Sequence, residues 1–356
     1  MRAGAWVEVR SREEILATLD KDGRLEGLPF MPEMLQFCGK RFPIYKSAYK
    51  SCDTVTGRYI GLSVERCVHL EHRCDGRYHG NCQAGCLLFW KEAWLKPLDG
   101  EETGSAELKM RSASHCTEAD MIDAACVQQG REPVYSCQAT ALLQYTRPLK
   151  WWDARQYPEA YRSANHSASE VMRGLTYLFY YYALSRHPRF GAPWRWLYDR
   201  ARPLWRGVPF PRRKGTIPMG QQAPRADLDL KTGDLVRVKS YEEILATLNE
   251  NCASRGLAFD AEMVPYCGNV YRVKTRVHQF LDEKTGKLKR LKTPAVILDR
   301  VVCKGRYSGQ RMFCPREIYL WWREIWLERV SPSQKDYEAP KRDTSKELPI
   351  TVEQRL

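Results

Sequence analysis

Residues 6–19 read Trp-Val-Glu-Val-Arg-Ser-Arg-Glu-Glu-Ile-Leu-Ala-Thr-Leu, and residues 235–248 repeat them as Leu-Val-Arg-Val-Lys-Ser-Tyr-Glu-Glu-Ile-Leu-Ala-Thr-Leu. The offset of 229 residues persists further along the chain, at Gly27/Gly256, Phe30/Phe259, Glu33/Glu262, Cys38/Cys267 and Cys74/Cys303. A three-residue insertion then changes the offset to 232, which matches Cys82 with Cys314 and Trp94 with Trp326. A period of this length indicates a duplicated domain and not a solenoid.

Each copy is expected to begin with a short alternating strand followed by a helix. Ser11 and Ser240 precede the helices, and a glutamate three residues later completes the spacing of a capping box. In the second copy, alternation and turn residues predict strands over 270–280, 288–291 and 294–302, with a hairpin turn at 282–286. Apolar residues at helical spacing after Pro315 predict a closing helix over 315–327.

These elements predict an α+β protein in which a small SH3-like β-barrel occurs twice, on either side of a helical middle domain. A three-stranded sheet with two helices is the alternative for the repeat unit. Within the middle domain, residues 101–114 read as a polar linker, and residues 117–127 and 137–205 read as helical. The predicted parts are 1–98, a barrel-like repeat rich in Cys and His; 99–205, the Cys- and aromatic-rich middle domain; 206–232, a proline-rich linker; 233–330, the second barrel-like repeat; and 331–356, a disordered tail.

The chain is strongly basic, with 57 Lys and Arg against 43 Asp and Glu and a formal net charge of +14. This balance favours an anionic partner, which could be nucleic acid, anionic lipid or an anionic small molecule such as a phosphorylated one, and the alternative is a basic surface that serves solubility. Arginines next to Trp194 and Trp205 suit contact with a nucleic-acid backbone combined with base stacking, and they are Arg195, Arg200, Arg202, Arg206, Arg212 and Arg213.

The sequence contains no apparent membrane or export signal. Residues 1–14 lack the apolar core of a signal peptide. The longest apolar stretch, 174–185, is shorter than the roughly 20 residues that span a bilayer. We therefore expect a cytoplasmic protein without a membrane span. The 13 cysteines then suggest metal ligation or buried thiols instead of a disulfide framework.

Three cysteines of the first copy recur in register in the second, which predicts that the members of each trio meet in space. The matched pairs are Cys38/Cys267, Cys74/Cys303 and Cys82/Cys314. A closed zinc site takes four Cys or His ligands tetrahedrally. The first copy carries further side chains of these types nearby, and its expected metal ligands are Cys38, His69, His72, Cys74, His79, Cys82 and Cys86.

The second copy lacks such a set. Ile318 stands at the position of Cys86, and Ser308 stands at that of His79. If its site is not lost, a residue outside the matched positions completes it, and the candidates are Cys252, His278 or a residue beyond the repeat. For both copies, the alternative is that the cysteines pack as small buried hydrophobes.

A second group of thiols lies in the middle segment, at Cys116, Cys126 and Cys137. Cys86 or Cys67 could complete a set of four ligands with them, and with Cys86 they predict a cofactor pocket where the first repeat meets the middle domain. Because thiolates are the usual ligands of iron–sulfur clusters, such a cluster is one expected cofactor besides a zinc or iron ion. Burial in a helical core is the alternative for Cys126.

No nucleotide-binding, hydrolase or metalloprotease motif occurs in the chain. Cys137 at a helix start could act as a nucleophile with His115, His166 or His187 as the base. The pattern as a whole predicts a zinc- or iron-binding protein, and specifically a metalloenzyme of small-molecule biosynthesis with its site between the first repeat and the middle domain. The alternatives are a nucleic-acid-binding protein with zinc-stabilised barrels and a non-catalytic interaction scaffold.

Overall fold

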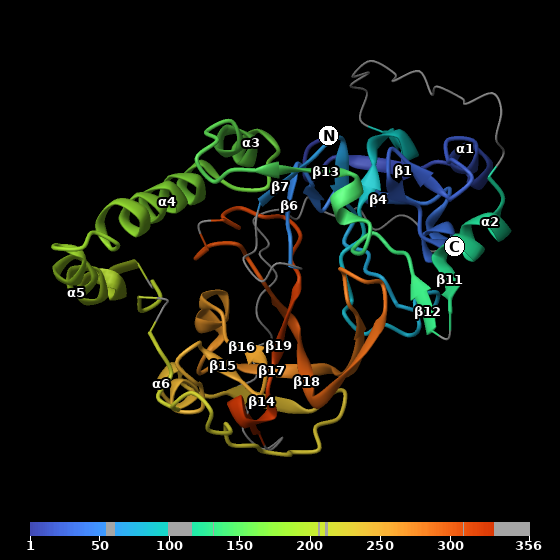
Figure 1. Ribbon diagram of the computed structural model, residues 1–356. Helices are drawn as coiled ribbons and strands as arrows, with labels where there is room; N and C mark the ends of the chain where they lie inside the picture. Colours follow the sequence, from blue (N-terminus) through green and yellow to red (C-terminus); the bar gives the residue numbers. More distant parts are fainter. Residues whose placement is uncertain are drawn as a thin grey trace.

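The computed structural model describes residues 1–54, 61–98, 116–130, 132–205, 207–210, 213–308 and 310–330 (Figure 1). The predicted polar linker 101–114 and the predicted tail 331–356 lie outside these residues. The first copy, in blue and cyan, lies beside the second copy, in orange and red, and helices of the middle segment extend to one side (Figure 1).

The first copy is built around a three-stranded antiparallel sheet in the order β10-β1-β4. Its strands are β1 (Trp6–Val9), β4 (Arg41–Pro43) and β10 (Leu95–Pro97). Helix α1 (Arg12–Leu16) begins at the predicted capping box, in which Ser11 Oγ accepts from the Glu14 N–H at 3.2 Å. The shorter elements are β2 (Arg24–Leu25), β3 (Leu28–Pro29), η1 (Pro32–Phe37), β5 (Lys46–Ser47), β6 (Lys50–Cys52), β7 (Gly61–Val64), β8 (Cys67–His69), β9 (Trp90–Lys91) and η2 (Glu92–Trp94).

The second copy has its elements in the same order, and its first strand again lies between two partners. Strand β14 (Leu235–Val238) pairs with β17 (Val270–Leu281) and β20 (Leu327–Arg329), and the complete sheet runs β19-β18-β17-β14-β20. Ser240 caps α6 (Tyr241–Leu245) in a second capping box. The other elements are β15 (Ala253–Ser254), β16 (Leu257–Ala258), η6 (Ala261–Tyr266), β18 (Leu288–Val302), β19 (Tyr319–Trp322) and η7 (Glu324–Trp326).

Matched residues make matched contacts in the two hydrophobic cores. The rings of Phe30 and Trp94 meet edge to face at 5.0 Å and 87°, and those of Phe259 and Trp326 meet at 5.4 Å and 83°. Both tryptophans are completely buried. Large aromatic side chains in this geometry contribute much of the packing energy of a small core. The core of the second copy also takes in Val208 and Leu230 from the predicted linker 206–232.

The prediction of SH3-like barrels was wrong. The described strands form small separate sheets, and the largest sheet is open, with β19 at one edge and β20 at the other. A barrel closes only when its two edge strands pair. In the first copy most strands are two to four residues long, too short to curve into a closed ring. The alternative, a three-stranded sheet with two helices, describes the first copy only in part, because its described strands also form the sheets β5-β8-β9 and β2-β3 and the pair β6-β7.

The predicted closing helix over 315–327 was also wrong. Residues 319–322 form strand β19, and a single 3₁₀ turn, η7, leads from it into β20. Leu320 and Trp322 alternate with less buried neighbours, as a strand requires. Trp322 and Trp326 are four residues apart, which mimics helical spacing, but the intervening 3₁₀ turn brings both into the core.

The middle segment is helical only in part. Its helices are α2 (Glu118–Ala125), η3 (Leu142–Gln144), α3 (Gln156–Arg162), α4 (Ala168–Phe179), the π-helical turn η4 (Tyr180–Leu184), α5 (Gly191–Ala201) and η5 (Arg202–Trp205). Strands β11 (Cys126–Gln129) and β12 (Glu132–Tyr135) form a hairpin. Strand β13 (Thr146–Leu149) pairs with β7 and so adds a strand of the middle segment to the first copy.

Each copy extends a hairpin onto the cysteine-rich loop of the other. Gln279 in β17 donates to the Gly80 carbonyl at 2.9 Å, and its counterpart Lys50 in β6 donates to the Met312 carbonyl at 2.5 Å. Gly80 and Met312 are matched by the offset of 232. The two copies therefore contact each other reciprocally, and each helps to enclose the loop of its neighbour.

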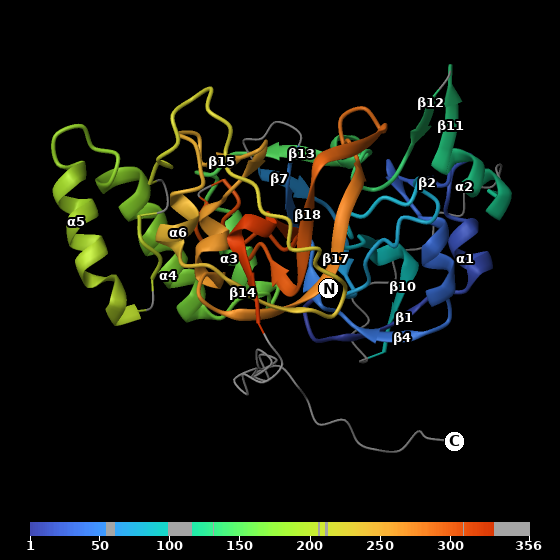
Figure 2. The same ribbon diagram turned by 90° about the horizontal axis from the view of Figure 1, so that it is seen from below.

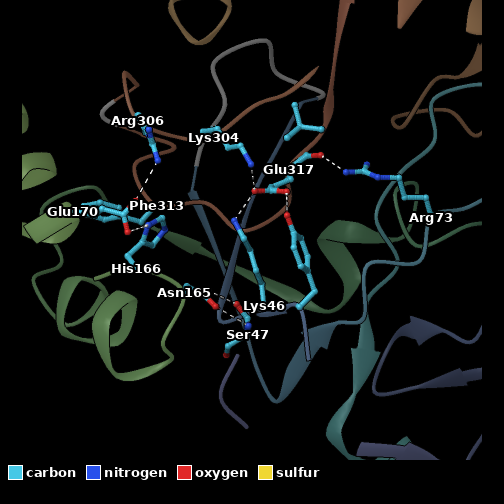
Figure 3. Close-up of polar contacts among 12 residues, drawn as sticks. Lys46, Ser47, Arg73, Asn165, His166, Glu170, Lys304, Arg306, Phe313 and Glu317 are labelled. Carbon is cyan, nitrogen blue, oxygen red and sulfur yellow. Dashed lines mark hydrogen bonds and ion pairs between the residues drawn. The ribbon is translucent and has the colours of Figure 1, made fainter. Parts of the chain in front are cut away.

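A buried carboxylate joins the copies at the centre of this interface (Figure 3). Glu317 accepts from Tyr45 OH and Lys46 Nζ at 2.6 Å each and from Lys304 Nζ at 3.0 Å. Burial opposes its ionisation, but Lys46 and Lys304 outweigh burial and hold the pKa of the carboxyl well below its usual range. Asn165 of the middle segment bonds the backbone of Ser47 beside this cluster (Figure 3).

Candidate metal centre

The loop 74–86 of the first copy is a compact turn that directs two potential ligands inward. The Cys74 N–H donates to the Cys86 carbonyl at 2.8 Å and closes the loop. Gly76 has φ +76°, and a Cβ atom there would lie 2.2 Å from the Cys82 carbonyl oxygen, so only glycine fits this position. His79 follows in the turn, and its imidazole is completely buried.

Glu33 approaches this loop from η1 and is 3% exposed. One ligand atom each of Glu33, Cys74 and His79 lies within 4.8 Å of the other two. The Glu33 Oε2 to His79 Nε2 distance is 3.7 Å. Within the described residues, neither carboxylate oxygen of Glu33 and neither ring nitrogen of His79 has a hydrogen-bond partner. The Glu33 carboxylate therefore lies close to both the imidazole of His79 and the thiol of Cys74, whose pKa it raises.

The electrostatics of this cluster favour a cation. A buried carboxylate without a hydrogen bond is costly, and buried charges in proteins are usually paired or coordinate metals. Burial and then Glu33 raise the pKa of the Cys74 thiol far above its usual range. A bound divalent ion reverses this situation, because its charge favours both the carboxylate and the thiolate.

A small cavity adjoins the cluster and brings together all three parts of the chain. It has about 40 Å³ of space for water and is lined by Cys74, His79, Cys82, Cys86 and Cys137. The second copy closes it with Leu281, at the end of β17, whose N–H donates to Cys82 Sγ at 3.3 Å. Burial raises the pKa of Cys86 to about 12 and that of Cys137 to about 11. These thiols are therefore neutral near pH 7 in the absence of a cation.

The sequence-predicted metal ligands divide into two groups. Cys74 and His79 belong to the cluster, and Cys82 and Cys86 line the cavity beside it. The other three predicted ligands lie elsewhere in the first copy. They are His69, whose Nδ1 contacts the Leu88 carbonyl at 2.8 Å; His72, stacked on Phe37 at 3.8 Å; and Cys38, half-buried at the end of η1.

The thiols of the predicted cofactor pocket also separate. Cys86 and Cys137 line the cavity. Cys116 packs in the core of the first copy, and Cys126 in β11 lies opposite Tyr135. Gln138, which follows Cys137, is fixed by structural hydrogen bonds to the backbone of Phe89 at 2.8 Å. These bonds hold the middle segment against the first copy and so place Cys137 at the cavity.

In the second copy the position of His79 is taken by Arg311. The Cys82 N–H donates to the His79 carbonyl at 3.1 Å, and the Cys314 N–H donates to the Arg311 carbonyl at 2.8 Å. The offset of 232 therefore applies here already, and the counterpart of His79 is Arg311, not the Ser308 assigned from the sequence.

Arg311 and its neighbours satisfy the second cluster with groups of the protein. Its guanidinium forms an ion pair with Asp260, and Nη1 lies 3.7 Å from Cys303 Sγ. Glu262, the counterpart of Glu33, accepts from the Tyr307 N–H at 2.5 Å. The candidates for completing a second metal site lie apart, since the Cys252 thiol contacts the Arg213 carbonyl and His278 is exposed.

Glu33 is the candidate ligand that the sequence search for Cys and His overlooked. The sequence carried a signal for Glu33, because an acidic residue, Glu262, occupies the matched position in the second copy. In the structure both glutamates are buried. With Glu33 included, the cluster offers one oxygen, one sulfur and one nitrogen donor, which is a donor set that zinc and iron accept. No family model, curated protein or solved structure matches this chain.

Proposed function

We propose that the protein is a metal-binding protein that holds one zinc or iron ion through Glu33, Cys74 and His79. The observation that carries this proposal is the buried Glu33 carboxylate, which faces an imidazole and a thiol and has no hydrogen-bond partner among the described residues. An ion bonded to all three side chains would neutralise the carboxylate and use the imidazole nitrogen as a ligand.

The ligand number favours a site with an open position. Structural zinc sites usually have four protein ligands, whereas catalytic sites have three and keep one position for water or substrate. The adjoining cavity of about 40 Å³ has room for a water molecule at that position. We propose that the ion acts there as a Lewis acid on water or a small molecule, at the junction of the first copy, the middle segment and the second copy.

The second copy supports the proposal from inside the same chain. It keeps the buried glutamate and the cysteine and adds a positive charge next to them, Arg311. The first copy has a histidine, His79, at that position, and its Nε2 lies 3.7 Å from Glu33 Oε2. A bound ion at the first copy would take the place that the guanidinium of Arg311 has in the second.

The decisive experiment is metal analysis of the purified full chain by mass spectrometry. We expect one zinc or iron ion per chain, and an absorption spectrum distinguishes an iron–thiolate centre from colourless zinc. Cys74→Ser and Glu33→Gln should each lose the ion. The matched controls Cys303→Ser and Glu262→Gln change the equivalent residues of the second copy and should keep it. A chain without metal, or full metal content in both first-copy variants, contradicts the proposal.

A further inference from the structure

Residues 168–205 form an arm, comprising α4, η4, α5 and η5, that extends from one side of the molecule (Figures 1 and 2). Its inner face is anchored. Tyr177 and Tyr181 pack with Met312 and Phe313 of the second copy, and Tyr198 of α5 stacks on Tyr180 at 4.5 Å. The arm is therefore held in place by one aromatic face, and its opposite face is free of such packing.

The outer face of the arm is unusually apolar for an exposed surface. Leu204 is 87% exposed and Trp196 is 67% exposed. The other exposed large apolar residues of the arm are Met172, Phe179, Phe190, Trp194, Leu197 and Trp205. Phe190, Leu197 and Leu204 follow one another at seven-residue intervals, which places them along one side of α5 and its continuation. Several large exposed apolar residues gathered on one segment of the chain are typical of an interaction surface.

The charge of the arm is predominantly positive. Residues 168–205 contain six arginines, at 173, 186, 189, 195, 200 and 202, and two acidic residues, Glu170, which pairs with Arg306, and Asp199. The Asp199 carboxylate accepts from the Phe210 N–H at 2.9 Å. In the part of the chain that the structure describes, none of the six arginines forms an ion pair with a carboxylate. The arm therefore carries arginine side chains and exposed apolar side chains on the same helices.

We propose that the α4–α5 arm docks on an anionic membrane surface. Interfacial helices combine Arg or Lys with Trp, Phe and Leu, because the apolar side chains enter the headgroup region while the cations meet anionic lipids. Tryptophan is itself enriched at membrane interfaces. None of the described helices has the length and apolar character needed to cross a bilayer. The arm would therefore lie on the surface without spanning it, and this inference is independent of the metal centre.

The same residues argue against two other occupants. A second copy of the arm would bring like charges together, which opposes self-association through this face. Single-stranded nucleic acid stacks its bases on aromatic rings and would leave aliphatic side chains such as Leu204 and Met172 uncovered. Of the basic face predicted from the sequence, Arg213 pairs with Glu242, and Arg206 and Arg212 lie outside the described residues.

Sedimentation of the full chain with lipid vesicles tests the proposal. The vesicles contain phosphatidylcholine alone or phosphatidylcholine mixed with anionic phosphatidylglycerol. We expect binding only to the mixed vesicles, a decrease in binding with added salt, and a blue shift of tryptophan fluorescence on binding. Arg189→Glu and Arg200→Glu should each weaken binding at least about fivefold. Trp196→Ser combined with Leu204→Ser should abolish the fluorescence shift.

The matched control changes exposed residues outside the arm, Leu143→Ser and Arg147→Glu, and should bind like the wild type. Circular dichroism establishes that each variant is folded, which is expected because all the altered side chains are exposed or at the surface. Failure to bind mixed vesicles overturns the proposal. Equal binding to neutral vesicles overturns it as well. Arm-dependent binding of single-stranded RNA or dimerisation of the chain, without vesicle binding, would assign the face to one of those occupants instead.

Discussion

The two copies keep the same buried glutamate and cysteine but differ in the residue that faces them. In the first copy Glu33 and Cys74 face His79, and the carboxylate is left without a hydrogen bond. In the second copy the equivalent Cys303 lies 3.7 Å from the guanidinium of Arg311, which also pairs with Asp260. One copy therefore neutralises its acidic groups with a cation of its own. Under the proposed function, the other would supply ligands to a bound metal ion.

The largest effect is expected when the arginine of the second copy, with its aspartate partner, is introduced into the first copy. In Met31→Asp/His79→Arg, both residues take the identity of their counterparts Asp260 and Arg311. We expect the variant to fold without metal and to contain none. Chelation should destabilise the wild type, by about 4 kcal/mol if the free ion is a thousandfold above its Kd, and should leave the variant unchanged. Chelator-dependent thermal unfolding measures this, and equal sensitivity of the two proteins would refute it.

The reciprocal exchange tests whether the second copy can be converted into a metal site. Asp260→Met/Arg311→His gives the second copy the residues of the first, next to the buried Glu262 and Cys303. We expect the metal content to rise from one ion per chain to two. The new site should bind about 10–100-fold more weakly than the first, since its surrounding hydrogen bonds are not arranged for a metal ligand. Titration with zinc followed by mass spectrometry measures both sites, and a folded variant with a single ion contradicts the equivalence.

A smaller effect is expected where the copies are joined by Glu317, whose counterpart in the first copy is Gly85. Both residues have positive φ, +40° and +59°. Glu317→Gln leaves Lys46 and Lys304 without their carboxylate, and the loss of one partner of a buried pair costs about 3–5 kcal/mol. Denaturant unfolding near pH 7 measures the loss. Glu8→Gln, which removes the exposed pair with Arg41, should cost about 1 kcal/mol or less.

The contribution of Glu317 should also depend on pH in a defined direction. Because the pKa of this carboxyl is lowered in the folded chain, the unfolded chain binds the proton first as the pH falls. The stabilisation is fully present above the unfolded pKa and is lost as the pH drops through the folded value. Wild type and Glu317→Gln should therefore converge in stability in acid, and a constant difference down to low pH would count against the ion cluster.

A further pH-dependent effect is expected at Lys50, whose counterpart in the second copy is Gln279. Burial lowers the pKa of the Lys50 ammonium to about 7, compared with about 10.4 in an unfolded chain. Between these values the unfolded chain binds the extra proton, so this residue makes stability rise with pH by about 1.4 kcal/mol per pH unit. Lys50→Gln should remove that slope, whereas the exposed control Lys40→Gln should retain it. Unfolding measured from pH 7 to 10 compares them, and parallel curves for all three proteins would be contrary to the prediction.

Local patterns in the sequence predicted local structure well. The capping boxes at Ser11 and Ser240 are present, because they depend on groups only three residues apart. The closing helix failed because the spacing of Trp322 and Trp326 is compatible both with a helix and with a strand followed by a 3₁₀ turn. The barrel failed because closure depends on the pairing of edge strands, and no local pattern encodes that pairing.

The amino-acid sequence alone shows that the chain contains an internal repeat and that the additional Cys and His residues belong to the first copy. It also shows that Cys74, His79, Cys82 and Cys86 lie within thirteen positions of one another. The tertiary structure was needed to see that Glu33 lies with Cys74 and His79 and that Cys137 and Leu281 line the adjoining cavity, whereas Cys38 does not. It was also needed to see that Arg311 is the counterpart of His79. The physical reason is that residues distant along the chain meet through packing and loop geometry. The spacing of residue types specifies contacts only over a few positions.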